Sequence, residues 1–130
     1  MNRIGIIVGN RPTFPSELCV AARSLVLDAL RKQDMQPVIL EEKSDGAGTV
    51  RNYRDAERCA ALFREHRDHL IGVIVTLPNF GDERGVADAI QLSDLRVPVL
   101  VHAFPDQSDQ MGGSSRRDAF CGKISLCNNL

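Results

Sequence analysis

The residues Ile4-Gly5-Ile6-Ile7-Val8-Gly9-Asn10-Arg11-Pro12-Thr13 form an apolar run that passes into a polar turn. A run that is apolar at successive positions is typical of a strand buried on both faces, between two layers of helices. A glycine and a proline end the run. In an open parallel sheet, ligands bind just beyond the carboxyl ends of the strands. We therefore predict a central strand over Ile4–Val8, with Asn10 and Arg11 at its functional tip.

Helical and strand patterns alternate along the rest of the chain. Helices are predicted over about 15–33, 54–69 and 83–93, the last with Asp82 as its N-cap, and strands over about 38–40, 71–76 and 97–102. In the first helix, the spacing of Leu18, Ala22, Leu25 and Ala29 predicts one helical stripe. Strands that alternate with helices of this length form right-handed β-α-β units. The sequence thus predicts a doubly wound α/β fold of the Rossmann or flavodoxin-like kind, with a parallel sheet in the order 2-1-3-4 and helices on both faces.

The end of the chain differs in character from the rest. Residues 106–117 are polar and contain Gly112-Gly113-Ser114-Ser115, which is typical of a loop or linker. Phe120, Ile124 and Cys127 then begin a helical stripe that has no partner in the sequence. We therefore expect an α/β domain over 1–105, and over 106–130 a linker and the start of a helix that leads to a second domain.

The composition argues against several classes of function. With 130 residues, of which 43% are hydrophobic, the chain can bury a core. The net charge of -1 gives no reason to expect nucleic acid or an anionic membrane as a partner, and few aromatic side chains are present to stack on bases. No apolar run approaches the roughly 20 residues that span a bilayer. Because the first residues lead directly into a strand, we expect no signal peptide and a cytoplasmic protein.

The four cysteines, Cys19, Cys59, Cys121 and Cys127, form no C-x-x-C pair. We therefore expect neither a zinc ribbon nor a thioredoxin-like redox site. Cys19 and Cys59 fall on the apolar faces of predicted helices. The pattern favours small buried hydrophobes in a reducing compartment over a metal or redox role.

Polar and aromatic residues follow the predicted strands at one edge of the sheet. They are Asn10, Arg11, Asn79, Phe80 and His102. An arginine donates two hydrogen bonds at once, and an aromatic face packs on the C–H groups of a sugar. This set suits a small polyhydroxylated or carboxylated ligand. The alternative is ordinary loop chemistry, with Arg11 solvated, Phe80 in the core and His102 bonded to a backbone carbonyl.

Several segments of the chain resemble the N-terminal domain of the L-fucose isomerase and L-arabinose isomerase superfamily, particularly its fucose-isomerase-like branch. The segments are Gly9-Asn10-Arg11-Pro12-Thr13, Leu77-Pro78-Asn79-Phe80-Gly81, Val97-Pro98-Val99-Leu100-Val101-His102-Ala103, Asp106-Gln107-Ser108-Asp109 and the closing 115–125. Each motif is short, and the weight lies in their order and spacing. The resemblance spans nearly the whole chain.

The resemblance implies part of a metal-dependent aldose–ketose isomerase that is assembled as a homo-oligomer. The divalent metal is commonly manganese, and the metal ligands and acid–base carboxylates belong to later domains, so no metal or cofactor is expected in this one. The N-terminal domain is a Rossmann-like cap that reaches into the active site of a neighbouring subunit. Arg11 would hydrogen-bond the sugar hydroxyls, and Phe80 stands where fucose isomerases carry Trp. We expect the isolated 130 residues to have no catalytic residues and no isomerase activity.

Other functions of a flavodoxin-like fold remain open at this stage. A non-catalytic small-molecule-binding module and an oligomerisation module are both compatible with the pattern. A phosphoacceptor receiver needs an aspartate at the tip of its central strand, where this chain has Val8-Gly9-Asn10. A flavin-binding domain needs a phosphate loop rich in Ser, Thr and Gly after that strand, where this chain has Arg11-Pro12.

Overall fold

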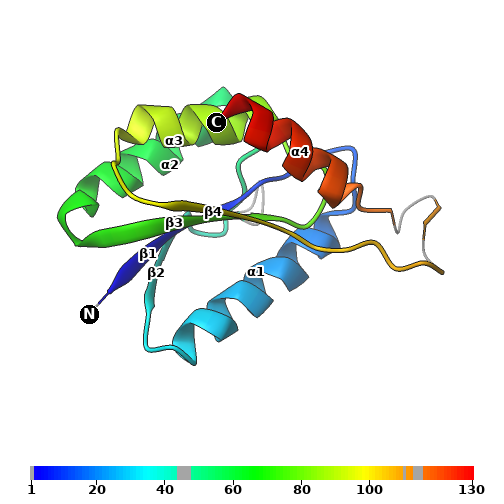
Figure 1. Ribbon diagram of the computed structural model, residues 1–130, viewed down its shortest axis with the longest axis horizontal. Coiled ribbons are helices and arrows are strands. Elements are labelled where there is room, and N and C mark those ends of the chain that lie inside the picture. The colour runs from blue at the N-terminus through cyan, green and yellow to red at the C-terminus, as the bar shows by residue number, and fades with distance from the viewer. Residues whose placement is uncertain (1, 44–47, 110, 113–115) are drawn as a thin grey trace.

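Strands and helices alternate along the chain in the computed structural model, which describes residues 2–43, 48–109, 111–112 and 116–130. The elements are β1 (Arg3–Val8), α1 (Ser16–Arg31), β2 (Gln36–Ile39), α2 (Tyr53–Glu65), the 3-10 helix η1 (Arg67–His69), β3 (Leu70–Leu77), α3 (Glu83–Ser93), β4 (Val99–Ala103) and α4 (Ala119–Asn129) (Figure 1). The helices and strands predicted from the sequence are thus present. Most of the glycine–serine part of the predicted linker, residues 113–115, lies outside the described residues.

The four strands form one parallel sheet in the order β2-β1-β3-β4. This confirms the predicted doubly wound α/β fold and its 2-1-3-4 order. β1 is central, since Gly5 pairs with Val38 of β2 on one side and with Val73 of β3 on the other. The strand order reverses direction between β1 and β3. In sheets of this kind, that reversal opens the crevice in which ligands bind.

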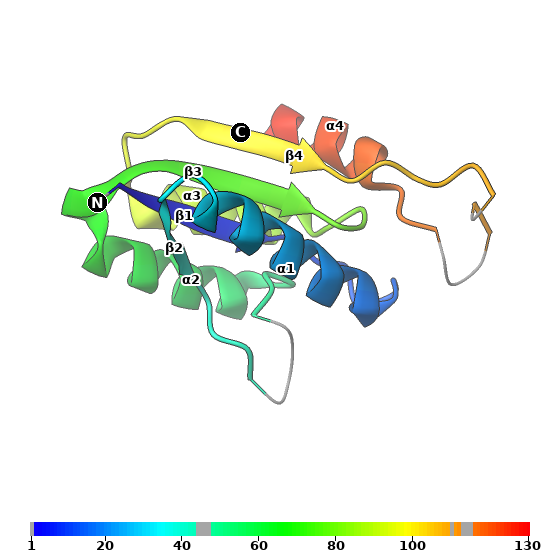
Figure 2. The same ribbon diagram turned by 90° about the horizontal axis from the view of Figure 1, so that it is seen from below.

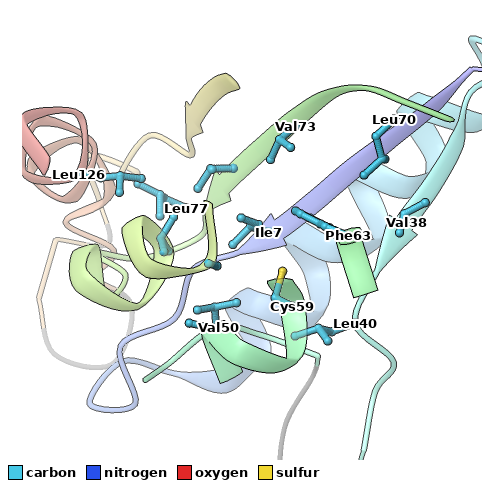
Figure 3. Close-up of a cluster of buried hydrophobic side chains, with 14 of the residues drawn as sticks. Ile7, Val38, Leu40, Val50, Cys59, Phe63, Leu70, Val73, Leu77 and Leu126 are labelled. Carbon is cyan, nitrogen blue, oxygen red and sulfur yellow. The ribbon is translucent and has the colours of Figure 1, made fainter. Parts of the chain in front are cut away.

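Helices cover both faces of the sheet. α1 lies on one face, and α2, α3 and α4 lie on the other (Figures 1 and 2). The core on the three-helix face includes Ile7, Phe63, Val73 and Leu77 (Figure 3). On the α1 face, the core contains Ile4, Ile6, Val8, Cys19 and Leu30. β1 supplies side chains to both cores, which explains why its sequence is apolar at successive positions.

Side-chain caps set the starts of α2 and α3. Asn52 Oδ1 accepts a hydrogen bond from Asp55 N at 2.9 Å, and Asp82 Oδ1 accepts one from Gly85 N at 3.0 Å. Each cap satisfies a backbone N–H that has no partner within its helix. The predicted N-cap at Asp82 is confirmed, and it fixes where the chain enters α3 beside the carboxyl edge of the sheet.

The α1 face of the sheet is only partly covered. Leu18, Ala22, Leu25 and Ala29 all lie in α1, as the helical stripe predicted. Leu25 is nevertheless 59% exposed, because no described helix lies beside α1 over β4. An open apolar groove of about 310 Å³ results, lined by Leu25, Val26, Ala29, Leu30, Ile74, Leu100, His102 and Phe104. The apolar stripe of α1 therefore extends beyond the part of this face that is covered.

α4 packs on the three-helix face with its small side chains inward. Ala119, Gly122 and Leu126 are buried, whereas Phe120 and Ile124 are 57% and 72% exposed. A Cβ atom at position 122 would lie 2.6 Å from the carbonyl carbon of Phe80, so only glycine allows this approach. The predicted stripe of larger residues thus faces outward. The second domain expected after α4 stays a prediction.

Candidate functional site

The side chain of Arg11 lies between the ends of β1 and β3, at the point where the strand order reverses, which we call the switch point. Its Nη2 atom is 2.8 Å from Oε2 of Glu83, and its Cζ atom is 4.3 Å from the centroid of the Phe80 ring. Arg11 follows β1, Phe80 follows β3, and Glu83 is the first residue of α3. The Arg11 side chain is 38% exposed, so the guanidinium is held in place yet reachable from solvent. The ion pair and the aromatic face together fix its orientation.

The buried side chain of Asn79 connects the loop after β1 with the loop after β3. Its Oδ1 atom accepts from the backbone N–H of Arg11 at 3.1 Å and of Gly81 at 2.9 Å, and its Nδ2 donates to Asn10 Oδ1 at 2.9 Å. Asn79 is fully buried and Asn10 is 8% exposed. Gly81 adopts a φ of 75°, a conformation that favours glycine. In the structure described here, both asparagines therefore serve to position the loops.

Arg117 also reaches this edge, although sequence reasoning assigned it no role at the site. Its backbone N–H donates to Asp106 Oδ1 at 2.7 Å, its Nη1 donates to the Pro78 carbonyl oxygen at 3.1 Å, and its Cζ lies 5.4 Å from the Phe104 ring centroid. It thereby joins the segment before α4 to the turn after β3.

Glu83 was not predicted as a site residue either. Its place in the first turn of a helix is the only sequence signal, and that signal also fits a residue that complements the helix dipole.

His102 lies on the α1 face of β4, in the apolar groove. Its Nδ1 is 3.0 Å from Thr76 Oγ1, and its ring meets Phe104 edge-on with 4.7 Å between centroids. Burial lowers the pKa of His102, and the positive charge of Lys123 lowers it further. The structure thus brings Asn10, Arg11, Asn79 and Phe80 together, whereas His102 contacts other partners. A role for His102 in sugar binding stays a prediction.

Cys19 lies beneath the site and is a buried thiol. Its Sγ accepts from Asn79 Nδ2 at 3.7 Å. Burial raises the pKa of the Cys19 thiol to about 11, against the opposing effect of Arg117, and raises that of Cys59 to about 12. Both groups are protonated near neutral pH and therefore weak nucleophiles. All four cysteines are free.

The donor set of the described residues does not fit a metal centre. No three His, Cys, Asp or Glu side chains gather within these residues. The Glu83 carboxylate at the switch point is already paired with Arg11, and the neighbouring Asp82 carboxylate caps α3. The chemistry available here is binding, with guanidinium donors, carboxylate acceptors and an aromatic face. Within the same part of the chain, no helix is long and apolar enough to cross a membrane.

The fold and the candidate site define a doubly wound α/β domain in which Asn10, Arg11, Asn79 and Phe80 converge where the strand order reverses. The chain belongs to the family described as "Fucose/sulfoquinovose isomerase, N-terminal domain", whose model matches residues 5–130. This confirms the family expected from the motifs around Arg11, Phe80 and His102. Comparison with curated proteins and with solved structures found no match for the chain.

Proposed function

We propose that this chain forms one wall of the sugar-binding site of an aldose–ketose isomerase, with Arg11 as the principal ligand of the sugar hydroxyls. The observation that carries the proposal is the Arg11 guanidinium held between Phe80 and Glu83 at the switch point, 38% exposed. Family membership supports the isomerase context. The geometry supports binding at this place in the sheet.

The three side chains are complementary to a sugar. A hydroxyl group both donates and accepts, so it can accept from Arg11 and donate to Glu83 at one place. The Phe80 ring offers an apolar face to the C–H groups of the sugar. Asn79 and Asn10 hold the loops that carry these groups, which limits the entropy lost on binding.

Aldose–ketose isomerisation moves a proton between adjacent carbons, and this domain would contribute positioning and the exclusion of water. In the proposed enzyme a divalent metal, with manganese the expected ion, and the acid–base carboxylates come from other domains. We propose that this domain acts as a cap on the active site of a neighbouring subunit in a homo-oligomer. The isolated 130 residues are accordingly expected to be inactive.

The test is Arg11→Ala in the intact enzyme, with Arg11→Lys as a graded variant. Loss of charge-assisted hydrogen bonds of about 1.5–3 kcal/mol lowers kcat/KM for sugar isomerisation by about 10- to 150-fold. Arg11→Lys keeps the charge but loses the planar fork, so an intermediate loss is expected. The measurement is steady-state kinetics on aldoses, together with circular dichroism to confirm the fold.

The matched control is Arg31→Ala. Arg31 lies in the last turn of α1, its side chain is largely exposed, and its guanidinium pairs with the nearby Asp28. This variant should turn over sugar at the wild-type rate. Unchanged kinetics for Arg11→Ala, in a folded protein, would remove Arg11 from the site and the proposal with it.

A further inference from the structure

The two edges of the sheet differ in their ability to accept another strand. In β2, the N–H of Gln36 donates to the Asn2 carbonyl oxygen at 3.0 Å, so the even-numbered residues turn their backbone groups toward β1. Pro37 therefore faces the outer edge, where it presents no N–H. β2 is also only four residues long. Short edge strands that carry proline resist further pairing.

The outer edge of β4 carries no such block. Val73 N donates to the Pro98 carbonyl oxygen at 2.9 Å, and Phe104 N donates to the Leu77 carbonyl oxygen at 3.1 Å. Even-numbered residues of this strand thus face β3, and the backbone groups of Val99, Val101 and Ala103 face outward. The sequence of β4 contains no lysine, glutamate or proline. Within the described residues, the sheet ends at this edge.

The position of α4 indicates on which side of β4 a following strand would lie. α4 follows β4, runs back along it and lies on the same face as α2 and α3 (Figures 1 and 2). α2 and α3 are the crossovers that carry the chain from β2 to β3 and from β3 to β4. About 98% of such crossovers are right-handed. On this face, a right-handed crossover after β4 continues in the same direction, to the position outside β4.

The open groove on the α1 face lies beside the same edge. Leu100 of β4 is 60% exposed and lines the groove together with Leu25 of α1. In doubly wound folds, helices cover both faces of the sheet. The uncovered surface is continuous with the free edge, so both lack a neighbour on the same side of the molecule.

We propose that the outer edge of β4 is the docking site for a fifth, parallel strand supplied by the polypeptide that follows this domain in the intact isomerase. The family is described as an N-terminal domain, so further chain follows it in its members. The strand would bond to Val99, Val101 and Ala103 and extend the order to β2-β1-β3-β4-β5. This inference depends on the crossover geometry and does not require Arg11 to bind sugar.

The test is backbone amide hydrogen exchange in the protein expressed from its whole reading frame and in the chain 1–130. In the whole protein, the amides of Val99, Val101 and Ala103 should exchange at least about a hundredfold more slowly than in the chain 1–130, because ladder-bonded amides exchange only when the structure opens. In the chain 1–130, these three amides should exchange fast while Leu100 and His102, which face β3, stay protected. The Leu100 and His102 amides are the internal control.

A variant separates strand docking from general stability. Val101→Pro removes an N–H that makes no bond to β3, so in the chain 1–130 it should leave the β3 pairing intact. In the whole protein, Val101→Pro should lower Tm by clearly more than it does in the chain 1–130, because it also removes a bond to the fifth strand. Fast exchange at the three outward amides of the whole protein would overturn the proposal. A reading frame that ends at Leu130 would overturn it as well, as would concentration-dependent protection in the chain 1–130, which would indicate pairing with a second copy.

Discussion

The guanidinium of Arg11 stacks on the ring of Phe80, with 4.3 Å between Cζ and the ring centroid. These residues are far apart in the sequence and meet because β1 and β3 are neighbours in the sheet. The ring restricts Arg11 to one orientation, with its Nη2 atom on Glu83. The proposed sugar binding would therefore depend on the loop after β3 as much as on the loop after β1.

Phe80→Leu is expected to weaken sugar turnover without unfolding the protein. The change removes a cation–π contact of about 0.5–1 kcal/mol, so kcat/KM of the intact enzyme should fall about two- to fivefold, mainly through KM. Phe120→Leu is the matched control, because Phe120 is exposed on α4. Equal kinetics for both variants would show that the ring of Phe80 does not hold Arg11 in its binding position.

Asn79→Ala is expected to destabilise the domain. The change leaves the N–H groups of Arg11 and Gly81 and the Asn10 Oδ1 atom without their partner, in a buried place. A buried unsatisfied group costs about 1–3 kcal/mol, so the free energy of unfolding should fall by about 2 kcal/mol or more. Urea denaturation measures this change.

Asn129→Ala provides the comparison for Asn79. The side chain of Asn129 donates to the Ser125 carbonyl oxygen at 2.8 Å on the exposed end of α4. Its removal should change stability by at most about 0.5 kcal/mol. A similar small effect at Asn79 would mean that the loops hold their places without this amide.

His102 is expected to make stability depend on pH below neutrality. Its pKa is lowered in the folded state, so the unfolded chain binds the proton more tightly. Its contribution is fully present above the unfolded pKa of about 6.5 and is lost as pH falls below that value. Tm should therefore decrease between pH 7.5 and 5, and His102→Gln should flatten this decrease.

His69→Gln is the control for the pH effect. His69 is exposed in η1, at the amino end of β3. This variant should keep the wild-type decrease in Tm. If His102→Gln keeps it too, other groups cause the pH dependence.

The fold was predictable because β1 and β3 are apolar at successive positions and the helices between them have clear stripes. Asp82 was predictable as a cap because its role depends on residues within one helical turn. The exposure of Leu25 was not predictable, since its spacing is helical whether or not another element covers that face. Local periodicity describes one element and contains no information on which neighbour is missing.

The site was predictable only in outline. Strand ends place Arg11 and Phe80 at one edge, because parallel strands end together. The pairing of Arg11 with Glu83 depends on the exact path of two loops, which no spacing in the sequence reveals. Arg117 comes from a segment beyond β4, and its bond to Pro78 depends on how α4 packs through Gly122. The burial of Asn79 is equally a product of tertiary packing.

The Arg11–Glu83 pair has a consequence for substrate selectivity. Together the two side chains are electrically neutral, so under the proposed function an uncharged sugar would bind without rearrangement of the pair. The carboxylate of Glu83 lies 2.8 Å from Nη2 of Arg11. A sulfonate group that approached Nη2 would therefore come close to this carboxylate, and the two negative charges would repel each other. Glu83→Gln should therefore improve binding of an anionic sugar relative to a neutral one, which competition calorimetry on the intact enzyme would measure. One carboxylate at the start of α3 would thus act as an electrostatic filter between the two classes of sugar named in the family description.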